Sequence, residues 1–320
     1  MNIIDWILYI PLVFCVCYLL LYAIASKFYR APQYPEARTL RRIVVLFPAY
    51  KEDRVIVASI QSFLEQDYPK ELYEIIVISD QMRPETNDAL ATLPIRLLMA
   101  NYKESSKAKA MSLAMNATAD IPYDAVVIMD ADNTAGTSFL SELNPVFQSG
   151  ARAVQAHRTA KNTNTDIAVL DAASEEINNS IFRSGHIALG LSSALIGSGM
   201  ALEACWFRQH IHLLETAGED KEMEALLLKQ RIHIEYLEHV YVKDEKTQKK
   251  EGIKNQRKRW IAAQFDSLVR ALPDFPKELL RGNIDYCDKV FQWTLLPRII
   301  LIFCTFFFTI LVTLVSPYSS

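Results

Sequence analysis

Two aspartates, Asp130 and Asp132, directly follow an apolar run at 125–129. Side chains two residues apart in extended backbone point to the same side of the chain. Two carboxylates in this arrangement suit Mg²⁺ or Mn²⁺, which prefer oxygen ligands and usually bind substrate phosphates as well. A solvated turn that leads to a helix cap at Thr137 or Ser138 would explain the same residues. The sequence therefore indicates a metal site at Asp132 and Asp130, with an ordinary turn as the alternative.

A second acidic pair, Glu219 and Asp220, follows Gly218 and precedes a predicted helix at 221–229. Acidic side chains in a first helical turn are stabilised by the helix dipole, so helix-start chemistry alone would account for them. Near a cleft, either carboxylate would also serve as a general base for an attacking hydroxyl. The sequence leaves both interpretations open.

The segment at 256–260, Gln-Arg-Lys-Arg-Trp, lies in a helical pattern that covers 253–268. At spacings of three and four residues, Gln256, Arg259 and Trp260 share one helix face. An arginine can hold a phosphate through two hydrogen bonds, and an indole ring can stack on a sugar or pack in a core. We therefore expect phosphate and sugar contacts from this face.

The scaffold for these residues is predicted by short apolar runs that alternate with amphipathic stretches. Strands are expected at 43–47, 75–78, 95–99, 125–129 and 153–155. Helices are expected at 55–64, 84–90, 107–117 and 138–147. Continuous β-branched runs between helices are typical of parallel strands that are buried on both faces. The pattern predicts an α/β fold with a twisted, mostly parallel sheet.

Ligands of such sheets bind beyond the carboxyl ends of the strands. The polar segment 48–52 follows the first expected strand, Asp80 follows the second, and the segment 130–133 follows the fourth. A single aspartate after a strand is usually a turn or cap residue. Because three strand ends bring polar groups to one edge, we expect the site there.

Both ends of the chain contain uncharged apolar runs. The run at 6–25 is about 30 Å long as a helix, enough to cross a bilayer. Basic residues follow this run, which favours an uncleaved anchor over a signal peptide and places the rest of the chain in the cytoplasm. The run at 299–315 is expected to be a second span, or else a buried core helix. These features predict a multi-pass protein of the cell membrane with a cytoplasmic catalytic domain.

Composition excludes several classes of protein. Of 320 residues, 51% are hydrophobic and 22% are charged, which excludes a disordered chain. With 34 Lys and Arg against 37 Asp and Glu, the net charge is -3, which argues against a nucleic-acid partner. The five cysteines form no CxxC pair, so neither a disulfide framework nor a zinc site is expected.

Taken in order, these residues resemble the membrane-bound glycosyltransferases of family 2, a GT-A fold group that includes cellulose and hyaluronan synthases. The resemblance covers residues 40 to 270. It rests on Phe47-Pro48-Ala49-Tyr50-Lys51-Glu52, Asp80, Lys109, Asp130-Ala131-Asp132, Gly197-Ser198-Gly199, Glu219-Asp220 and Gln256-Arg257-Lys258-Arg259-Trp260. The chain departs from the family at Lys51 and Ala114, where Asn is usual.

The resemblance implies a role for each matched residue. The nucleotide sugar would contact Ala49, Tyr50, Glu52, Asp80, Lys109, Asp130 and Arg259. The sugar and acceptor pocket would be lined by Ser198, Gly199, Gln256 and Trp260. Asp220 would be the catalytic base with Glu219 beside it, and Asp132 with Asp130 would bind the metal.

The implied function is inverting transfer of a sugar from a nucleotide sugar, a UDP-sugar, with Mg²⁺ or Mn²⁺. The acceptor would be membrane-proximal or lipid-linked, as in cell-surface polysaccharide synthesis. The expected parts are an N-terminal transmembrane helix at 1–26, a GT-A catalytic domain at 40–240, a basic amphipathic segment with the Q-x-x-R-W motif at 241–285, and a C-terminal transmembrane segment at 290–316. The alternatives are a non-catalytic glycosyltransferase-like membrane scaffold and a nucleotidyltransferase.

Overall fold

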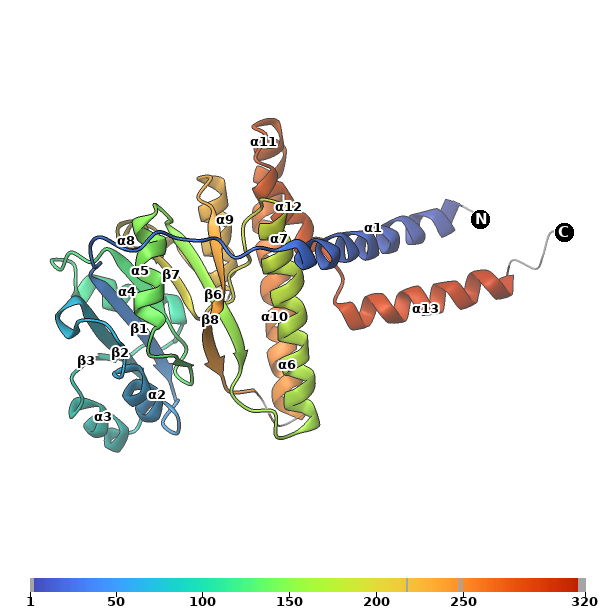
Figure 1. Ribbon diagram of the computed structural model, residues 1–320. Coiled ribbons are helices and arrows are strands. Elements are labelled where there is room, and N and C mark those ends of the chain that lie inside the picture. Colours follow the sequence, from blue (N-terminus) through green and yellow to red (C-terminus); the bar gives the residue numbers. More distant parts are fainter. Residues whose placement is uncertain (1–2, 217, 247, 249, 316–320) are drawn as a thin grey trace.

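The computed structural model in Figure 1 describes residues 3–216, 218–246, 248 and 250–315. Its centre is an eight-stranded sheet in the order β3-β2-β1-β4-β7-β6-β8-β5. The strands are β1 Ile43–Tyr50, β2 Tyr73–Asp80, β3 Arg96–Ala100, β4 Ala125–Ile128, β5 Thr134–Ala135, β6 Ala153–Ala160, β7 Met200–Glu203 and β8 Ile234–Asp244. Strands β1 to β4 pair in parallel, as do β6 and β8, whereas β7 and β5 pair antiparallel with their neighbours. The expected α/β fold with a mostly parallel sheet is confirmed.

Helices cover both faces of this sheet and extend beyond one side of it (Figure 1). They are α1 Ile3–Ala25, α2 Ile56–Phe63, α3 Pro84–Ala91, α4 Lys107–Ala117, α5 Phe139–Gln148, α6 Asp166–Asn179, α7 Gly185–Ala188, α8 Ala204–His210, α9 Glu219–Lys229, α10 Lys250–Ala271, α11 Phe275–Leu280, α12 Ile284–Thr294 and α13 Arg298–Val315. A short π-helical turn, Ser180–Ser184, joins α6 to α7.

The core is divided between the two faces because successive side chains of a strand point in opposite directions. In β1, Val44 and Leu46 pack in a cluster that includes Met111 of α4 and Phe207 of α8. Val45 and Phe47 pack in the other cluster, with residues of α2 and α5. The sheet is therefore covered on both faces, which leaves its carboxyl edge to carry polar side chains.

The structure also contains strands that the sequence pattern did not predict. β8 alternates buried residues such as Ile234 and Tyr236 with charged ones such as Glu235, and its parallel pairing with β6 runs through Asp244. The expected domain boundary at 240 therefore falls inside a strand. The basic stretch that follows is described only in part, because residues 247 and 249 lie outside the described chain.

The two ends of the chain differ from the expected pair of spans. Within the described residues, one helical segment, Tyr9–Phe28, is by itself long and apolar enough to cross a membrane. Helices α12 and α13 pass the same test only as a pair, bent by 66°. Their break contains Pro297, which lacks an N–H and restricts the residue before it. The segment at 290–316 is thus not one helix, and the multi-pass arrangement is not supported; residues 1, 2 and 316 lie outside the described chain.

Candidate active site

Lys107 lies at the point where four segments of the chain meet. Its Nζ contacts a carboxylate oxygen of Asp130 and donates to the carbonyl oxygen of Gly197 at 2.6 Å. The same Nζ is 3.7 Å from Oε1 of Glu219. The first turn of α4, the β4–β5 turn, the 197–199 loop and the start of α9 therefore converge at the carboxyl edge of the sheet.

The lysine at this point is Lys107 and not Lys109, the residue matched from the sequence. Lys109 is exposed, and its Nζ donates to the carbonyl oxygen of Glu104 at 2.8 Å. Lys107 lies three and four residues before Ala110 and Met111, which are buried, so it shares their side of the helix. This helical spacing between Lys107 and two apolar residues is the sequence signal that identifies Lys107.

The charge of Lys107 is secured by the acids around it. Burial acts to lower its pKa, but the charges of Asp130 and Glu219 outweigh burial, and the net shift of the pKa is upward. The ammonium group therefore stays protonated at neutral pH and holds three segments of the site together.

Asp130 and Asp132 lie on a turn and not in the extended strand that the sequence suggested. β4 ends at Ile128, and the backbone N–H of Asn133 donates to the carbonyl oxygen of Asp130 at 3.0 Å. The side-chain oxygen of Asn133 accepts from the N–H of Asp130 at 3.0 Å, and its amide nitrogen donates to Asp132 at 3.1 Å. Asn133 is completely buried, so this amide fixes both aspartates.

The carboxylates near this turn are crowded. Burial, followed by the charges of Asp130 and Asp244, raises the pKa of Asp132 to about 6. Burial, followed by the charges of Asp130 and Glu245, raises the pKa of Glu52. The local excess of negative charge is what a divalent cation would relieve.

The donor set fits a hard cation that is shared with a ligand. Within the described part of the chain, no three His, Cys, Asp or Glu side chains are grouped so as to hold an ion alone. Mg²⁺ and Mn²⁺ sites of this kind take one or two carboxylates and complete their shell with phosphate oxygens and water. Asp130 and Asp132 meet that requirement.

Glu219 and Asp220 flank the 197–199 loop from the start of α9. A Cβ built on Gly197 would lie 3.8 Å from Oε1 of Glu219 and 3.9 Å from Oδ2 of Asp220. Burial raises the pKa of Glu219 to about 7, against the opposing charge of Lys107. Glu222 instead accepts the N–H groups of the preceding loop, at 2.8 Å from Glu215. The acidic pair therefore faces the loop, whereas Glu222 accepts hydrogen bonds from backbone N–H groups that precede the helix.

The 197–199 loop depends on its glycines. Gly197 and Gly199 have φ of 78° and 62°, and a Cβ at Gly199 would lie only 2.9 Å from Cγ2 of Val242. Ser198 between them is completely buried, and its hydroxyl forms no hydrogen bond with the described residues. The Ser198 carbonyl oxygen accepts from Nε2 of Gln155 at 3.0 Å, which holds the loop against β6.

The ends of β1 and β2 form a separate part of the same edge. Asp80 is 3% exposed, and its Oδ1 has no hydrogen-bond partner among the described residues. Tyr50 lies opposite Asp80 in the strand register, and its ring is half exposed beneath the ammonium group of Lys51 at 4.9 Å. Ala49 is buried behind them. A buried acceptor beside an exposed ring suits a ligand that has both an N–H donor and a flat face.

We call Asp130, Asp132, Glu219 and Asp220 the acidic cluster. The Q-x-x-R-W residues do not contact it directly. Arg259 and Trp260 are exposed, and neither they nor Gln256 form a hydrogen bond or ion pair with the described chain. Ala263, three residues after Trp260, packs against Gly218 at the start of α9, with 3.0 Å to a built Cβ. The motif therefore lies about one to two turns along α10 from the acidic pair, on the face that approaches it.

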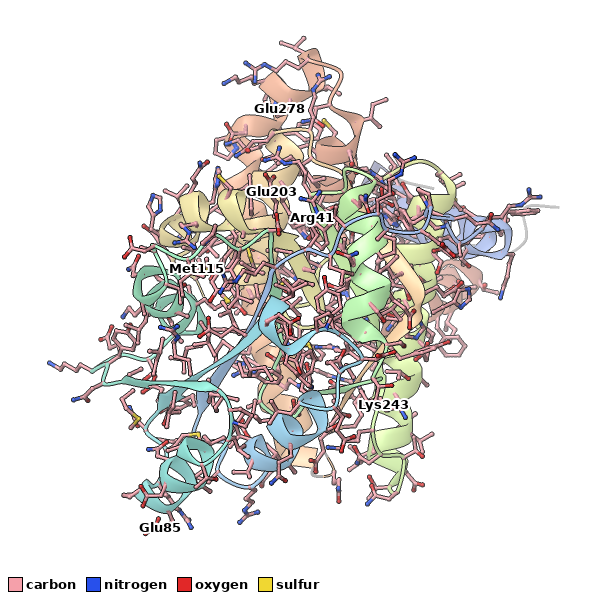
Figure 2. All side chains as sticks on the ribbon, turned by 60° about the vertical axis from the view of Figure 1, so that its left-hand side comes forward. Arg41, Glu85, Met115, Glu203, Lys243 and Glu278 are labelled. Atoms are coloured by element: carbon pink, nitrogen blue, oxygen red, sulfur yellow. The ribbon has the colours of Figure 1, made fainter. Side chains whose placement is uncertain are left out.

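Two cavities are lined by residues other than Lys107, Asp130, Asp132, Glu219 and Asp220. One, of about 310 Å³, lies at the amino ends of β1 and β4, where Figure 2 labels Arg41 and Glu203. The other, of about 770 Å³, is lined by Thr134, Thr159, Tyr241 and Lys243 on the outer strands.

Comparison with known proteins identifies the family of this chain. The Bacillus subtilis (strain 168) protein described as "Probable glycosyltransferase YdaM" is 31% identical over 101 residues, 30% of this chain and 24% of that protein. The mannosyltransferase PcManGT from Pyrobaculum calidifontis, solved in complex with GDP-Man and Mn²⁺, has a TM-score of 0.60 at 17% identity over 90% of this chain and 85% of its own. S. aureus TarS 1–349 has a TM-score of 0.49 at 13% identity over 72% of this chain and 65% of its own.

These comparisons bear first on the fold. The likeness to PcManGT shows that the α/β fold is GT-A-like. The match to YdaM spans about a quarter of that protein's length. The family model described as "Glycosyltransferase like family 2" matches residues 41–263, which contain β1 to β8 and the acidic cluster. The chain therefore belongs to glycosyltransferase family 2.

Proposed function

We propose that the chain is an inverting glycosyltransferase that moves a sugar from a nucleotide sugar, a UDP-sugar, to an acceptor hydroxyl. The observation that supports it most is the convergence of Lys107, Asp130, Glu219 and Asp220 around Gly197. Nζ of Lys107, Oε1 of Glu219 and Oδ2 of Asp220 all lie within 4 Å of a Cβ built on Gly197, and Asp130 contacts the same Nζ. A carboxylate base and a fixed positive charge are groups that can assist transfer of a sugar from a diphosphate.

The donor would be held along the carboxyl edge of the sheet. Asp80 would accept an N–H of the base through its unpaired oxygen, with Ala49 and Tyr50 as the wall of the site. Glu52 and Asp130 would lie beside the diphosphate, and Lys107 would take the role proposed from the sequence for Lys109. A divalent ion bound at Asp132 and Asp130 would supply charge stabilisation for the departing diphosphate.

The transfer step would use Asp220 as the base. Its carboxylate would accept the proton of the acceptor hydroxyl, whose oxygen attacks the anomeric carbon from the side opposite the diphosphate. This single displacement inverts the configuration of that carbon. Glu219, more buried and with a pKa of about 7, would be the second candidate for the base.

The acceptor pocket would lie between the loop and α10. Ser198 and Gly199 would form its floor, and Gln256, Arg259 and Trp260 would close over the acceptor and the diphosphate. Arg259 and Trp260 are exposed and Gln256 is partly buried, so the first two side chains can reach a ligand without unpacking. A flexible arginine and an indole ring are the side chains that bind phosphate and sugar.

A membrane-proximal or lipid-linked acceptor is supported by the apolar surface on one side of the molecule. Helices α1 and α13 extend from that side (Figure 1). α10 exposes Ile261, Phe265 and Val269 at spacings of four residues. We propose a role in cell-surface polysaccharide synthesis, with the catalytic domain in the cytoplasm and the chain attached to the cell membrane.

The experiment is a screen of UDP-, GDP- and TDP-sugars with Mn²⁺ or Mg²⁺, read by thermal stabilisation and by product. A UDP-sugar should raise the melting temperature only with the metal, and UDP should be released. Asp132→Asn should weaken the metal-dependent shift. Release of pyrophosphate would favour a nucleotidyltransferase, and stabilisation without any product would favour a scaffold.

A further inference from the structure

A buried ion pair joins the helix that carries the acidic pair to the helix before the C-terminal apolar segment. Nζ of Lys289 in α12 lies 2.9 Å from Oε1 of Glu224 in α9, and the two side chains are 1% and 2% exposed. Charges buried to this degree are costly unless they are fully paired. Lys289 has one further acceptor, Oε1 of Gln292, at 2.8 Å.

Glu224 is linked to the site indirectly, through its helix and through one hydrogen bond to the chain before the 197–199 loop. It lies four residues after Asp220, so the two share one side of α9. Its Oε1 also accepts the backbone N–H of Leu195 at 3.3 Å. Leu195 precedes the loop whose Gly197 carbonyl oxygen accepts from Lys107. One carboxylate oxygen therefore holds the acidic helix to the loop that faces it.

Lys289 is itself fixed by its neighbour in α12. Asp288 accepts from the hydroxyl of Tyr18 at 3.1 Å and from Tyr22, both in α1, and lies 3.0 Å from Nε2 of His186. In Figure 1, α12 lies between α9 and α1. Two successive residues of α12 therefore bind different helices. Asp288 binds α1, and Lys289 binds α9.

We propose that Lys289 and Glu224 are positioning residues for sugar transfer. Their ion pair fixes the separation between α9 and the 195–199 loop, so that Asp220 and Glu219 face Gly197 and Lys107. This inference rests on the proposed function, because it assigns the pair to the geometry of the transfer step. Neither side chain touches the site, so the pair acts on turnover through α9 and leaves the donor contacts intact.

The test compares variants of the full chain in detergent. Lys289→Met should lower kcat by about tenfold or more while the donor KM changes by less than about twofold. Lys289→Arg should recover most of the rate, because the guanidinium group can still pair with Glu224. The matched control is Lys229→Met, which removes a partly exposed ion pair between α9 and Asp274 (2.7 Å) and should leave both constants near the parental values.

A double variant keeps the test independent of folding. Glu224→Gln with Lys289→Met leaves no lone buried charge, so the protein should stay folded, and its kcat should still be low. Parental kcat in either the single or the double variant, in folded protein, would overturn the proposal. So would a loss of kcat in Lys229→Met as large as the loss in Lys289→Met.

A second readout does not need activity. Hydrogen exchange at the amides of 195–199 should become faster in Lys289→Met and stay parental in Lys229→Met. Unchanged exchange would reject the positioning role. If the parent releases no nucleoside diphosphate from any donor, the proposed function fails, and the exchange result still decides whether the pair holds the loop.

Discussion

At the scale of single residues, one ammonium group organises the proposed site. Lys107 contacts Asp130, the Gly197 carbonyl oxygen and Glu219, which come from three distant parts of the sequence. A preorganised charge aimed at a leaving group typically contributes a large share of rate enhancement. Lys109, two residues away on the same helix, faces Glu104 and has no such contacts.

This contrast gives a direct prediction. Lys107→Met should lower kcat/KM by about 10² or more, because a fixed positive charge is removed from the site. Lys109→Met should remain within about twofold of the parent, since exposed substitutions away from a site rarely matter. Steady-state kinetics with the donor found in the sugar screen measures both. If Lys109→Met lowers kcat/KM more than Lys107→Met does, Lys109 and not Lys107 is the lysine that acts in the site.

Glu219 gives a second residue-scale prediction, on the pH dependence of stability. Its folded pKa of about 7 is above its unfolded value, so the folded state retains a proton that the unfolded state has lost. Its contribution to stability is therefore fully present below about pH 4.5 and is lost as the pH rises through about 7. In nucleotide-free protein, the stability of the parent relative to Glu219→Gln should fall between pH 5 and pH 8, by about 3 kcal/mol at most.

Thermal unfolding of both proteins across this pH range is the measurement. Asp132 titrates in both, so the difference between them isolates Glu219. If the difference in stability does not vary with pH, the pKa of Glu219 is not raised in the folded state.

At the scale of elements, the 197–199 loop is the least tolerant part of the site. Gly199→Ala should destabilise the protein by about 2 kcal/mol or more, from the positive φ together with the 2.9 Å contact to Val242. The matched control is Gly190→Ala, which has a φ of +77° and no heavy atom within 4 Å of the built Cβ. The control should show only the backbone cost of about 1 kcal/mol.

Unfolding of both variants by heat, each against the parent, provides the comparison. Equal destabilisation of the two would mean that the loop accommodates a side chain and that its packing against β8 is not tight.

The elements that the sequence predicted well are those with strong local patterns. β1, β2 and β4 are buried on both faces, so their apolar runs are continuous and unmistakable. Because these strands were expected to be parallel, their carboxyl ends were expected to lie at one edge of the sheet. Asp80 and Asp130 do lie at that edge. β8 was missed because its burial is interrupted by exposed residues at 239, 241 and 243, and because its pairing with β6 is a long-range contact.

The site was predictable as a set of motifs but not as a set of contacts. Nothing local indicates that the Lys107 ammonium reaches Gly197, 90 residues later. The choice between Lys107 and Lys109 needed only the helix phase, which the buried Ala110 and Met111 provide. The turn at Asp130 and Asp132 depends on the buried amide of Asn133, a local signal that the extended-strand interpretation overlooked.

At the scale of the whole molecule, the proposed orientation in the membrane can be tested by labelling a native cysteine. Cys205, in α8, is exposed and lies in the domain that we propose to be catalytic. If that domain is cytoplasmic, an impermeant maleimide should label Cys205 in broken cells and not in intact ones. Cys205→Ser is the control, because it should remove the labelling gained on breaking the cells. Labelling of Cys205 from outside intact cells would reverse the proposed orientation.

The central claim for the whole molecule is that it is a transferase and that Asp220 is its base. The measurement is the transfer rate beside the donor affinity, for the parent and for Asp220→Asn. This substitution keeps the shape of the side chain, so stability should barely move. We predict that turnover falls by about 10² or more while donor binding stays within about threefold, because the proposal assigns donor binding to other residues. Near-parental turnover in Asp220→Asn would contradict the assignment and leave Glu219 as the base, and no turnover in the parent with any sugar donor would contradict the account as a whole.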